Sequence, residues 1–180
     1  RFGKSRGLDS LINGFYESLV RVQEIYYSKS NQKNKLHFKC VDLKNYVSLE
    51  KVIKKYESKG IFFEGVIHFA GLKSVEESIK KPLIYWENNV LGTLNLLNIL
   101  NLKKCKAFIF SSSATVYGNV KETFLREDLP CNPCNPYGET KAAIEKILSN
   151  IFTSDPDNWR ICNLRYFNPV GADPSGLIGE

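Results

Sequence analysis

Short apolar runs alternate along the chain with longer segments in which apolar positions recur every three or four residues. The first pattern is typical of buried strands and the second of amphipathic helices. We expect strands at 36–41, 65–70, 107–110 and 160–165, and helices at 48–56, 82–100 and 136–151. Buried strands that alternate with helices form a parallel sheet with helices on both faces. The pattern therefore predicts an α/β fold with a doubly wound parallel sheet.

Polar or glycine-containing segments follow three of the expected strands: FAG at 69–71, SSS at 111–113 and YFNP at 166–169. In a doubly wound sheet, ligands bind beyond the carboxyl ends of the strands. We therefore expect binding or catalytic residues in these segments.

The composition narrows the class of protein. With 180 residues, of which 43% are hydrophobic and 24% charged, the chain is typical of a globular domain. No apolar run approaches the roughly 18 residues of a transmembrane helix, so we expect no membrane association. The net charge of +6 comes mainly from early lysines without aromatic or arginine-rich neighbours, which predicts a solvated surface and no nucleic-acid site. Methionine is absent, which indicates that the sequence begins inside a longer chain.

The cysteines do not follow the spacing of a disulfide framework. They are five in number and scattered, at Cys40, Cys105, Cys131, Cys134 and Cys162. This spacing and the absence of an N-glycosylation sequence indicate a reducing, cytoplasmic setting. The C-x-x-C pair at 131–134 lacks a second pair of ligands, and both histidines are isolated, so we expect no metal.

Tyr137 and Lys141 form a Y-x-x-x-K pair at the start of an expected helix, a spacing that places both side chains on one face. A phenol is a weak base at neutral pH, and lowering its pKa by about 3 units needs roughly 4 kcal/mol. One cation at about 5 Å provides roughly 3 kcal/mol, so Lys141 and a positively charged nicotinamide ring would suffice together. Ser113 could hydrogen-bond the substrate oxygen while Tyr137 takes its proton. The alternative is a tyrosine that packs on its own turn beside a solvated lysine.

A second Y-x-x-x-K occurs at Tyr117 and Lys121. Gly118 and Asn119 follow this tyrosine and predict a turn. We therefore expect that Lys121 does not stack on Tyr117, and we place the chemistry at the other pair.

Three long motifs then carry a specific resemblance: FSSSATVYG at 110–118, NPYGETK at 135–141 and LRYFNPVGA at 164–172. With VIHFAGLK at 66–73 and NNVLGT at 88–93, they closely resemble the UDP-glucose 4-epimerase family of the extended short-chain dehydrogenases/reductases. The resemblance extends from about residue 8 to residue 180 and implies a Rossmann-like, NAD-binding fold.

The resemblance implies an isomerase that interconverts UDP-galactose and UDP-glucose through a 4-keto intermediate, in galactose metabolism. Tyr137 would act as general base and acid on the sugar 4-hydroxyl, Lys141 would lower the pKa of Tyr137, and Ser113 would orient the 4-oxygen. NAD would take the hydride and return it to the other face. The full-length protein would be a homodimer.

The resemblance also implies binding residues. Those for the substrate are Ser113, Tyr137 and Asn168. Those for NAD are Asp9, Asn13, Gly14, Asp42, Leu43, Phe69, Ala70, Gly71, Lys73, Asn88, Ser113, Tyr137, Lys141 and Phe167. From the residues alone, Asp9, Asn13 and Gly14 also fit a simple turn, Asp42 a strand-end cap, and Phe69 and Phe167 core positions.

The reaction class follows from two residues. A sugar 4,6-dehydratase also removes a C5 proton and expels the 6-hydroxyl, which needs carboxylates. The resemblance implies that such a relative would carry Asp and Glu at the positions of Ala114 and Thr115. Neither residue can do that acid–base work, which favours epimerisation. The alternatives are an epimerase for another nucleotide sugar, such as a UDP-N-acetyl sugar or a uronate, and a non-catalytic Rossmann-like binding domain.

The chain also departs from the family. It has no G-x-x-G-x-x-G phosphate loop, so we expect the first βα unit, whose backbone amides would hold the NAD pyrophosphate, to be missing. We interpret residues 1–7 as an unmatched leader and residues 8–180 as a partial NAD-binding domain without the C-terminal substrate domain.

Overall fold

The structure is a computed structural model that describes residues 5–30 and 36–178. It divides into two compact units, Arg1–Asp42 with Pro169–Glu180, and Leu43–Asn168. We call these the smaller and the larger unit. Residues 1–4 of the expected leader lie outside the described residues.

The smaller unit contains β1 (Ser5–Asp9), α1 (Tyr16–Ser30) and β2 (Leu36–Cys40). The two strands are parallel, with Asp9 opposite Cys40. Residues 5–7, which we expected in an unmatched leader, thus form the first half of a strand. Their sequence is polar and lacks the apolar run by which the other strands were found, and α1 was missed as well.

The larger unit contains a three-stranded parallel sheet in the order β3-β4-β5. Its strands are β3 (Gly65–His68), β4 (Ala107–Ser113) and β5 (Arg160–Tyr166). Its helices are α2 (Tyr46–Glu57), α3 (Val75–Lys80), α4 (Pro82–Tyr85), α5 (Gly92–Leu102) and α6 (Pro136–Ser154), with a π-helical turn η1 (Trp86–Leu91) and a 3₁₀ turn η2 (Ala114–Tyr117). The predicted strand–helix alternation and parallel pairing are confirmed.

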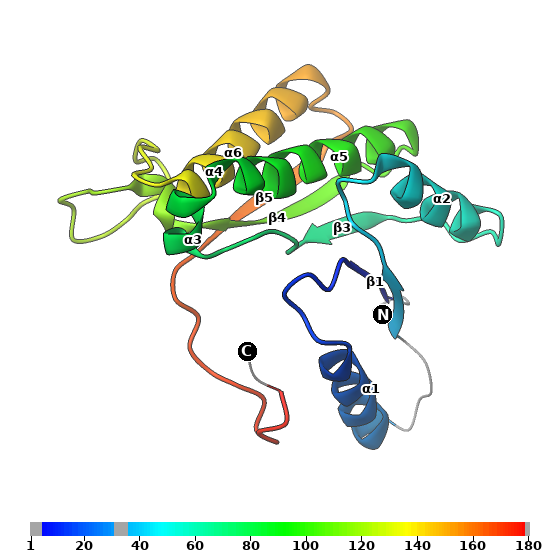
Figure 1. The fold of residues 1–180 in the computed structure, drawn as a ribbon. Coiled ribbons are helices and arrows are strands. Elements are labelled where there is room, and N and C mark those ends of the chain that lie inside the picture. The colour runs from blue at the N-terminus through cyan, green and yellow to red at the C-terminus, as the bar shows by residue number, and fades with distance from the viewer. Residues whose placement is uncertain (1–4, 31–35, 179–180) are drawn as a thin grey trace. The chain divides into compact units, whose positions relative to one another are not determined.

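Helices α4, α5 and α6 lie over one face of the three-stranded sheet (Figure 1). Phe108 and Phe110 of β4 point to this face and are fully buried, as are Ile144 and Leu148 of α6. Ile109 lies between the two phenylalanines and is 36% exposed, because successive side chains of a strand point to opposite faces. The core of the larger unit therefore lies between β4 and these helices.

The helix expected over residues 82–100 is divided in three. The segment from Pro82 to Leu102 runs through α4, η1 and α5, and the π-helical turn inserts one wide turn in the middle. Pro82 stands at the start, as expected for a residue without a backbone donor. Apolar periodicity does not register a single wide turn, so the sequence could not locate η1.

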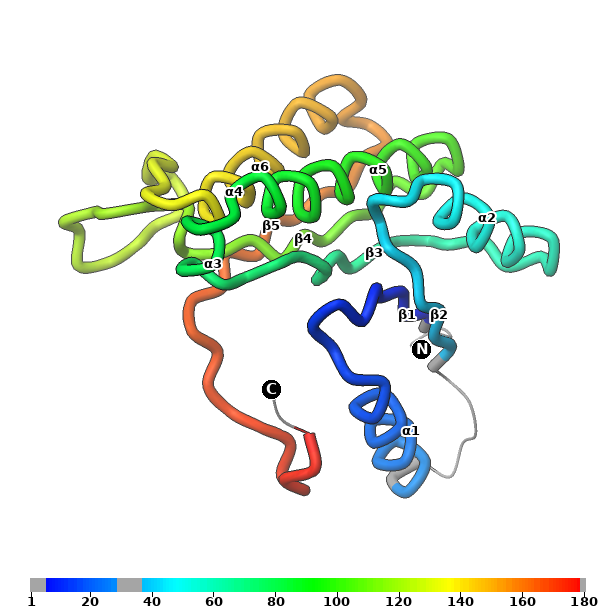
Figure 2. The backbone as a smooth tube through the Cα atoms, in the orientation of Figure 1, coloured from blue at the N-terminus to red at the C-terminus, as the bar shows by residue number. Residues whose placement is uncertain are grey.

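The 3₁₀ turn η2 follows β4 directly, and a long loop then joins η2 to α6, as the yellow-green tube in Figure 2 shows.

No helix in the described residues is long and apolar enough to cross a membrane.

Candidate active site

Tyr137 and Lys141 lie in the first turns of α6, where the local sequence sets the start of the helix. The Asn135 side chain accepts a 2.9 Å hydrogen bond from the backbone N–H of Gly138, and Pro136 occupies the first helical position. Such a cap and proline are favoured at a helix N-terminus. Both Tyr137 and Lys141 are buried, with 9% and 5% of their surface exposed. This excludes the alternative of a solvated lysine.

The Lys141 ammonium is held between the helix and the sheet. Its Nζ donates a 2.7 Å hydrogen bond to the carbonyl oxygen of Ser111 and lies 4.8 Å from the centre of the Phe110 ring. The same nitrogen is 5.8 Å from the centre of the Tyr137 ring. The expected proximity of cation and phenol is therefore present. Burial lowers the pKa of Lys141 to about 8.

Ser113 ends β4 and caps the 3₁₀ turn η2. Its hydroxyl oxygen accepts hydrogen bonds from the backbone N–H of Thr115 at 3.2 Å and from the Thr115 hydroxyl at 3.0 Å. Gly138 brings α6 close to this turn, because a Cβ there would lie only 2.9 Å from the carbonyl oxygen of Thr115. The structure thus packs the start of α6, which bears Tyr137, against the turn that begins at Ser113.

The loop after β3 is tied to the same site by Asn89, which is 2% exposed. The Asn89 amide accepts from the Leu72 N–H at 2.8 Å and donates to the Leu72 carbonyl at 3.1 Å. It also donates to the Thr140 hydroxyl at 3.1 Å. Gly71 has φ +150, and a Cβ there would lie 3.1 Å from Asn89 Oδ1 and 3.8 Å from Lys141 Nζ. Glycine therefore allows the loop to approach the ammonium.

His68 is buried next to the site and is uncharged at neutral pH. Its Nε2 pairs with the Thr93 hydroxyl at 2.8 Å, and its ring stacks on Phe110 at 5.8 Å between ring centres. Burial, and secondarily the charge of Lys141, lowers the pKa of His68 to about 3.

The remaining predicted residues of the larger unit differ in their surroundings. Phe69 and Phe167 are 63% and 61% exposed, which excludes core positions for both. Ala70 is half-buried, and Lys73 and Asn168 are exposed. Asn88 lies in η1 and donates to the Ile84 carbonyl at 2.8 Å, whereas its neighbour Asn89 makes the contacts to the loop. Leu43 packs on Gly92, whose Cβ would lie 3.2 Å from that of Leu43.

The predicted residues Asp9, Asn13, Gly14 and Asp42 belong to the smaller unit. The carboxylate of Asp9 accepts a 2.6 Å hydrogen bond from the Leu11 N–H, as in a turn after a strand. Asn13 and Gly14 are exposed in the loop before α1, and Asp42 is half-buried.

As predicted, the second Y-x-x-x-K, at Tyr117 and Lys121, is not a stacked pair. Tyr117 ends η2, and Gly118 follows with φ +67, while Lys121 lies outside any helix. The Tyr117 hydroxyl instead accepts a 2.9 Å hydrogen bond from Arg165.

The sequence did not reveal four polar residues around the site: His68, Asn89 and Glu145, which are buried, and Arg165, which is half-buried. Only Glu145 left a signal, because it falls on the buried face of α6 at the spacing of Tyr137 and Lys141. In the described residues no three His, Cys, Asp or Glu side chains gather as a metal site requires, and all five cysteines are free thiols.

The residues of the larger unit fit the nicotinamide half of NAD. The backbone of Gly71 lies close to the Lys141 ammonium, since a Cβ there would be 3.8 Å from Nζ. Ser113 and Tyr137 add buried hydroxyl groups at the end of β4 and the start of α6. A buried cation and hydroxyl groups are suited to a ribose and to a hydroxyl that loses a proton.

A comparison with known proteins shows the family to which the chain belongs. A family model described as GDP-mannose 4,6 dehydratase matches residues 8–175, so the chain belongs to this family of extended short-chain dehydrogenases/reductases. Within it, UDP-glucose 4-epimerase 1 of Oryza sativa subsp. japonica is 46% identical over 173 residues, which are 96% of this chain and 46% of the relative. UDP-glucose 4-epimerase 2 of Arabidopsis thaliana is 47% identical, over 96% of this chain and 47% of the relative.

Solved structures agree. UDP-glucose 4-epimerase from Bifidobacterium longum, in complex with NAD⁺ and UDP, superposes with a TM-score of 0.85 at 40% identity, over 97% of this chain and 49% of that one. The enzyme from Stenotrophomonas maltophila, with bound NAD and formylated UDP-arabinopyranose, superposes with a TM-score of 0.83 at 34% identity, over 97% and 48%. The Rossmann-like fold is thereby confirmed. The chain spans about half the length of the curated relatives that it matches.

Proposed function

We propose that the protein containing this chain is an NAD-dependent UDP-glucose 4-epimerase that interconverts UDP-galactose and UDP-glucose. The observation that carries the proposal is the buried Lys141 ammonium, 5.8 Å from the Tyr137 ring in the helix that packs against the Ser113 turn. Relatives at 44–47% identity over 96% of the chain bear the same activity in their names.

Tyr137, Ser113 and Lys141 each have a separate role in the proton transfer. Tyr137 accepts the proton of the sugar 4-hydroxyl and later gives it back, and Ser113 holds the 4-oxygen by a hydrogen bond. Lys141 favours the ionised phenol by its charge. NAD, when bound, supplies the acceptor and donor of the C4 hydride. The side chains of Ala114 and Thr115 in η2 offer no carboxylate, which favours epimerisation over the dehydration named in the family model.

We propose that the cofactor and substrate contacts follow the resemblance. Phe69, Ala70, Gly71, Lys73 and Asn88 would line the nicotinamide ribose and the pyrophosphate, with Phe167 beside the nicotinamide and Asn168 at the phosphates of the nucleotide sugar. Leu43 would contact the adenine side. The exposure of both phenylalanines leaves their rings free of the core. Asp9, Asn13, Gly14 and Asp42 would bind the adenosine half.

We also propose a homodimer and a cytoplasmic setting. Exposed apolar side chains on the helical segment from Pro82 to Leu102 support the dimer, and they include Leu83, Ile84, Trp86, Leu91 and Leu94. Analytical ultracentrifugation of the full-length protein and of a Leu83→Glu/Leu94→Glu variant tests this, because only the variant should sediment as a monomer. Five free thiols support a reducing compartment.

The deciding experiment uses the purified full-length protein without added cofactor or reductant. Conversion of UDP-galactose to UDP-glucose without net release of NADH would support the proposal. Retained NAD without conversion would point to another nucleotide sugar, and UDP-N-acetylgalactosamine and UDP-xylose serve as the comparison substrates. Failure to retain NAD and to convert any of these sugars would contradict an epimerase.

A further inference from the structure

An ion pair between the buried Glu145 and the half-buried Arg165 joins α6 to β5 near the candidate active site. Arg165 Nη2 lies 2.7 Å from Glu145 Oε2, and Arg165 Nε lies 3.0 Å from Glu145 Oε1. The Glu145 and Arg165 side chains are only 9% and 18% exposed. A buried pair offsets the cost of desolvation only if its remaining donors and acceptors are also satisfied. The other contacts of Glu145 and Arg165 therefore indicate which segments the ion pair holds in place.

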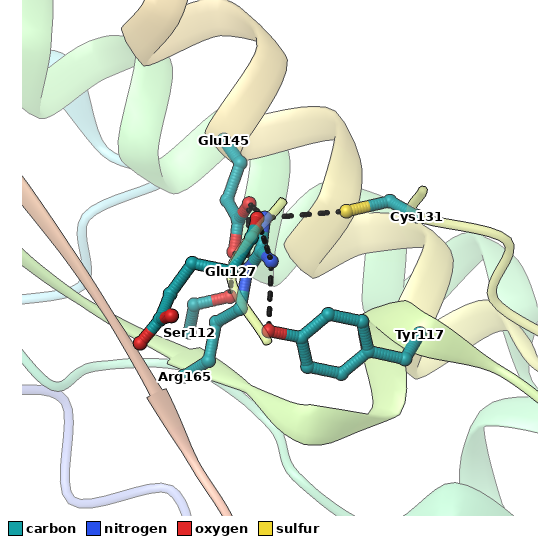
Figure 3. A network of polar contacts seen from close by, with 6 residues as sticks. All are labelled: Ser112, Tyr117, Glu127, Cys131, Glu145 and Arg165. Carbon is teal, nitrogen blue, oxygen red and sulfur yellow. Dashed lines mark hydrogen bonds and ion pairs between the residues drawn. The ribbon is translucent and has the colours of Figure 1, made fainter. Parts of the chain in front are cut away.

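The remaining guanidinium donors reach the segment that follows β4 (Figure 3). Nη1 donates to the Tyr117 hydroxyl at 2.9 Å and to the Glu127 carbonyl at 3.2 Å. Nη2 donates to the Cys131 sulfur at 3.3 Å, and the guanidinium carbon lies 4.8 Å from the centre of the Tyr117 ring. Arg165 thus anchors the end of η2 and the loop that leads to α6.

The Glu145 carboxylate anchors the other side of η2. Its Oε1 accepts a 2.5 Å hydrogen bond from the hydroxyl of Ser112, the residue before Ser113. Ser112 is also paired in register with Arg165 across β4 and β5. Residues on both sides of Ser113 are therefore held in place. Ser112 is held by its hydrogen bond to Glu145, and Tyr117 by its hydrogen bond from Arg165.

Glu145 shares its helix with the catalytic pair. It lies four residues after Lys141 and eight after Tyr137, so the three side chains follow one buried face of α6. One carboxylate thus connects the helix that carries the base to the strand end that carries Ser113.

We propose that Glu145 and Arg165 are positioning residues that hold Ser113 at its working distance from Tyr137 and Lys141. The proposal rests on the proposed epimerase function for its rate effect, but not for the anchoring itself. A shift of about 1 Å between a catalytic group and its substrate can cost about a hundredfold in rate. Loss of the pair should therefore slow the chemical step and leave the binding of NAD and nucleotide sugar nearly unchanged.

The decisive variant is Glu145→Met/Arg165→Met in the full-length protein. It removes both charges together, and apolar replacement of a whole buried pair is often neutral for stability. We expect a thermal midpoint close to that of the unmodified protein, retained NAD, and a KM within about threefold. The kcat should fall by about a hundredfold, and Arg165→Lys should restore part of it relative to Arg165→Met, since a lysine keeps the charge but not the two-pronged contact.

A matched control removes another partly buried ion pair of the same unit. Lys103 and Glu57 pair at 2.7 Å with side chains 27% and 22% exposed. Glu57→Met/Lys103→Met should keep both kcat and KM. A similar loss of kcat in the control would assign the effect to general destabilisation and overturn the proposal, as would a kcat of the main variant within about threefold of the unmodified value.

Two milder variants remain informative if the double variant does not fold. Ser112→Ala removes only the contact to Glu145, and Tyr117→Phe removes only the hydroxyl that contacts Arg165. Each should lower kcat several-fold with an unchanged KM, and two unchanged kcat values would overturn the proposal.

Amide hydrogen exchange separates this proposal from the epimerase assignment. In any folded variant lacking one of these contacts, amides of residues 111–117 should exchange faster while those of residues 141–148 stay protected. Faster exchange in a protein that converts no sugar would contradict the proposed function and support the anchoring. Unchanged exchange would overturn the anchoring whatever the activity.

Discussion

The Lys141 ammonium donates a 2.7 Å hydrogen bond to the carbonyl oxygen of Ser111, two residues before Ser113. The cation that we propose acts on Tyr137 is thereby attached to the strand that carries Ser113, the hydroxyl with which it is expected to work. The Phe110 ring, 4.8 Å from Nζ, makes the surroundings largely apolar. Burial lowers the pKa of Lys141 to about 8, so the group is charged at neutral pH and loses its charge just above it.

This pKa predicts an alkaline limit for the activity. Lys141 must be charged to favour the ionised phenol, and its protonated fraction falls about tenfold for each pH unit above its pKa. We expect kcat/KM for UDP-galactose to fall above about pH 8, the pKa of Lys141. Initial rates between pH 6 and pH 10 measure the limit.

Lys141→Arg serves as the control, because arginine stays charged throughout this range. Its rates should be lower, since the guanidinium fits the Ser111 contact poorly, but the fall above pH 8 should disappear. The same alkaline fall in Lys141→Arg would show that another group causes it.

Tyr137→Phe removes the proposed base without changing the shape of the buried ring. General acid–base catalysis contributes about 10²–10⁴ in rate, and we expect a loss of kcat in this range. The variant should retain NAD, because the cation and the loop at Gly71 are untouched. Tyr56→Phe, in α2 outside the site, is the matched control and should keep its turnover. Near-normal turnover of Tyr137→Phe would exclude this residue as the base.

Gly138→Ala tests the close approach of α6 and η2. An alanine Cβ would lie 2.9 Å from the Thr115 carbonyl oxygen and 3.0 Å from the Pro133 Cβ, so the helix start or the turn must shift. Alanine would otherwise stabilise a helix by about 1 kcal/mol relative to glycine. We expect kcat to fall at least tenfold with at most a small change in the thermal midpoint. An unchanged kcat would mean that the distance between Tyr137 and the turn after Ser113 does not limit the reaction.

The sequence predicted α6, the helix of the proposed base, and the strand ends because both depend on local signals. Asn135 and Pro136 start α6, and the apolar runs of β3, β4 and β5 are short and bounded. These signals are contained within a few residues, and together with the turn predicted at Gly118 and Asn119 they placed the chemistry at Tyr137 and Lys141 and not at the second Y-x-x-x-K.

What the sequence could not predict depends on contacts between distant segments. Asn88 and Asn89 are adjacent and chemically identical, and only the π-helical turn η1 decides that Asn89 faces the loop at Leu72. The polar strand β1 pairs with β2 across more than 20 intervening residues without an apolar run of its own. Glu145 and Arg165 are 20 residues apart, and β5 must be in register with β4 before they meet.

The buried neutral His68 predicts a loss of stability in acid. Burial lowers its pKa to about 3 in the folded state, whereas an unfolded histidine titrates near pH 6.5. Between these two pKa values, His68 binds a proton in the unfolded chain but not in the folded one. The free energy of unfolding therefore falls as the pH falls. Above about pH 6.5 the contribution is fully present, and it is lost progressively toward pH 3.

At pH 4.5 the group lies about two units below its unfolded pKa, which corresponds to a loss of about 3 kcal/mol in the free energy of unfolding. Urea unfolding of the full-length protein at pH 7 and at pH 4.5 measures the difference. His68→Gln retains a partner for the Thr93 hydroxyl but cannot titrate, so its stability should depend less on pH by about this amount. His37→Gln is the control, because His37 lies in β2 and not in this core. Equal acid sensitivity of His68→Gln and the unmodified protein would mean that His68 can be protonated inside the fold, contrary to its burial among Phe108, Phe110 and the Lys141 ammonium.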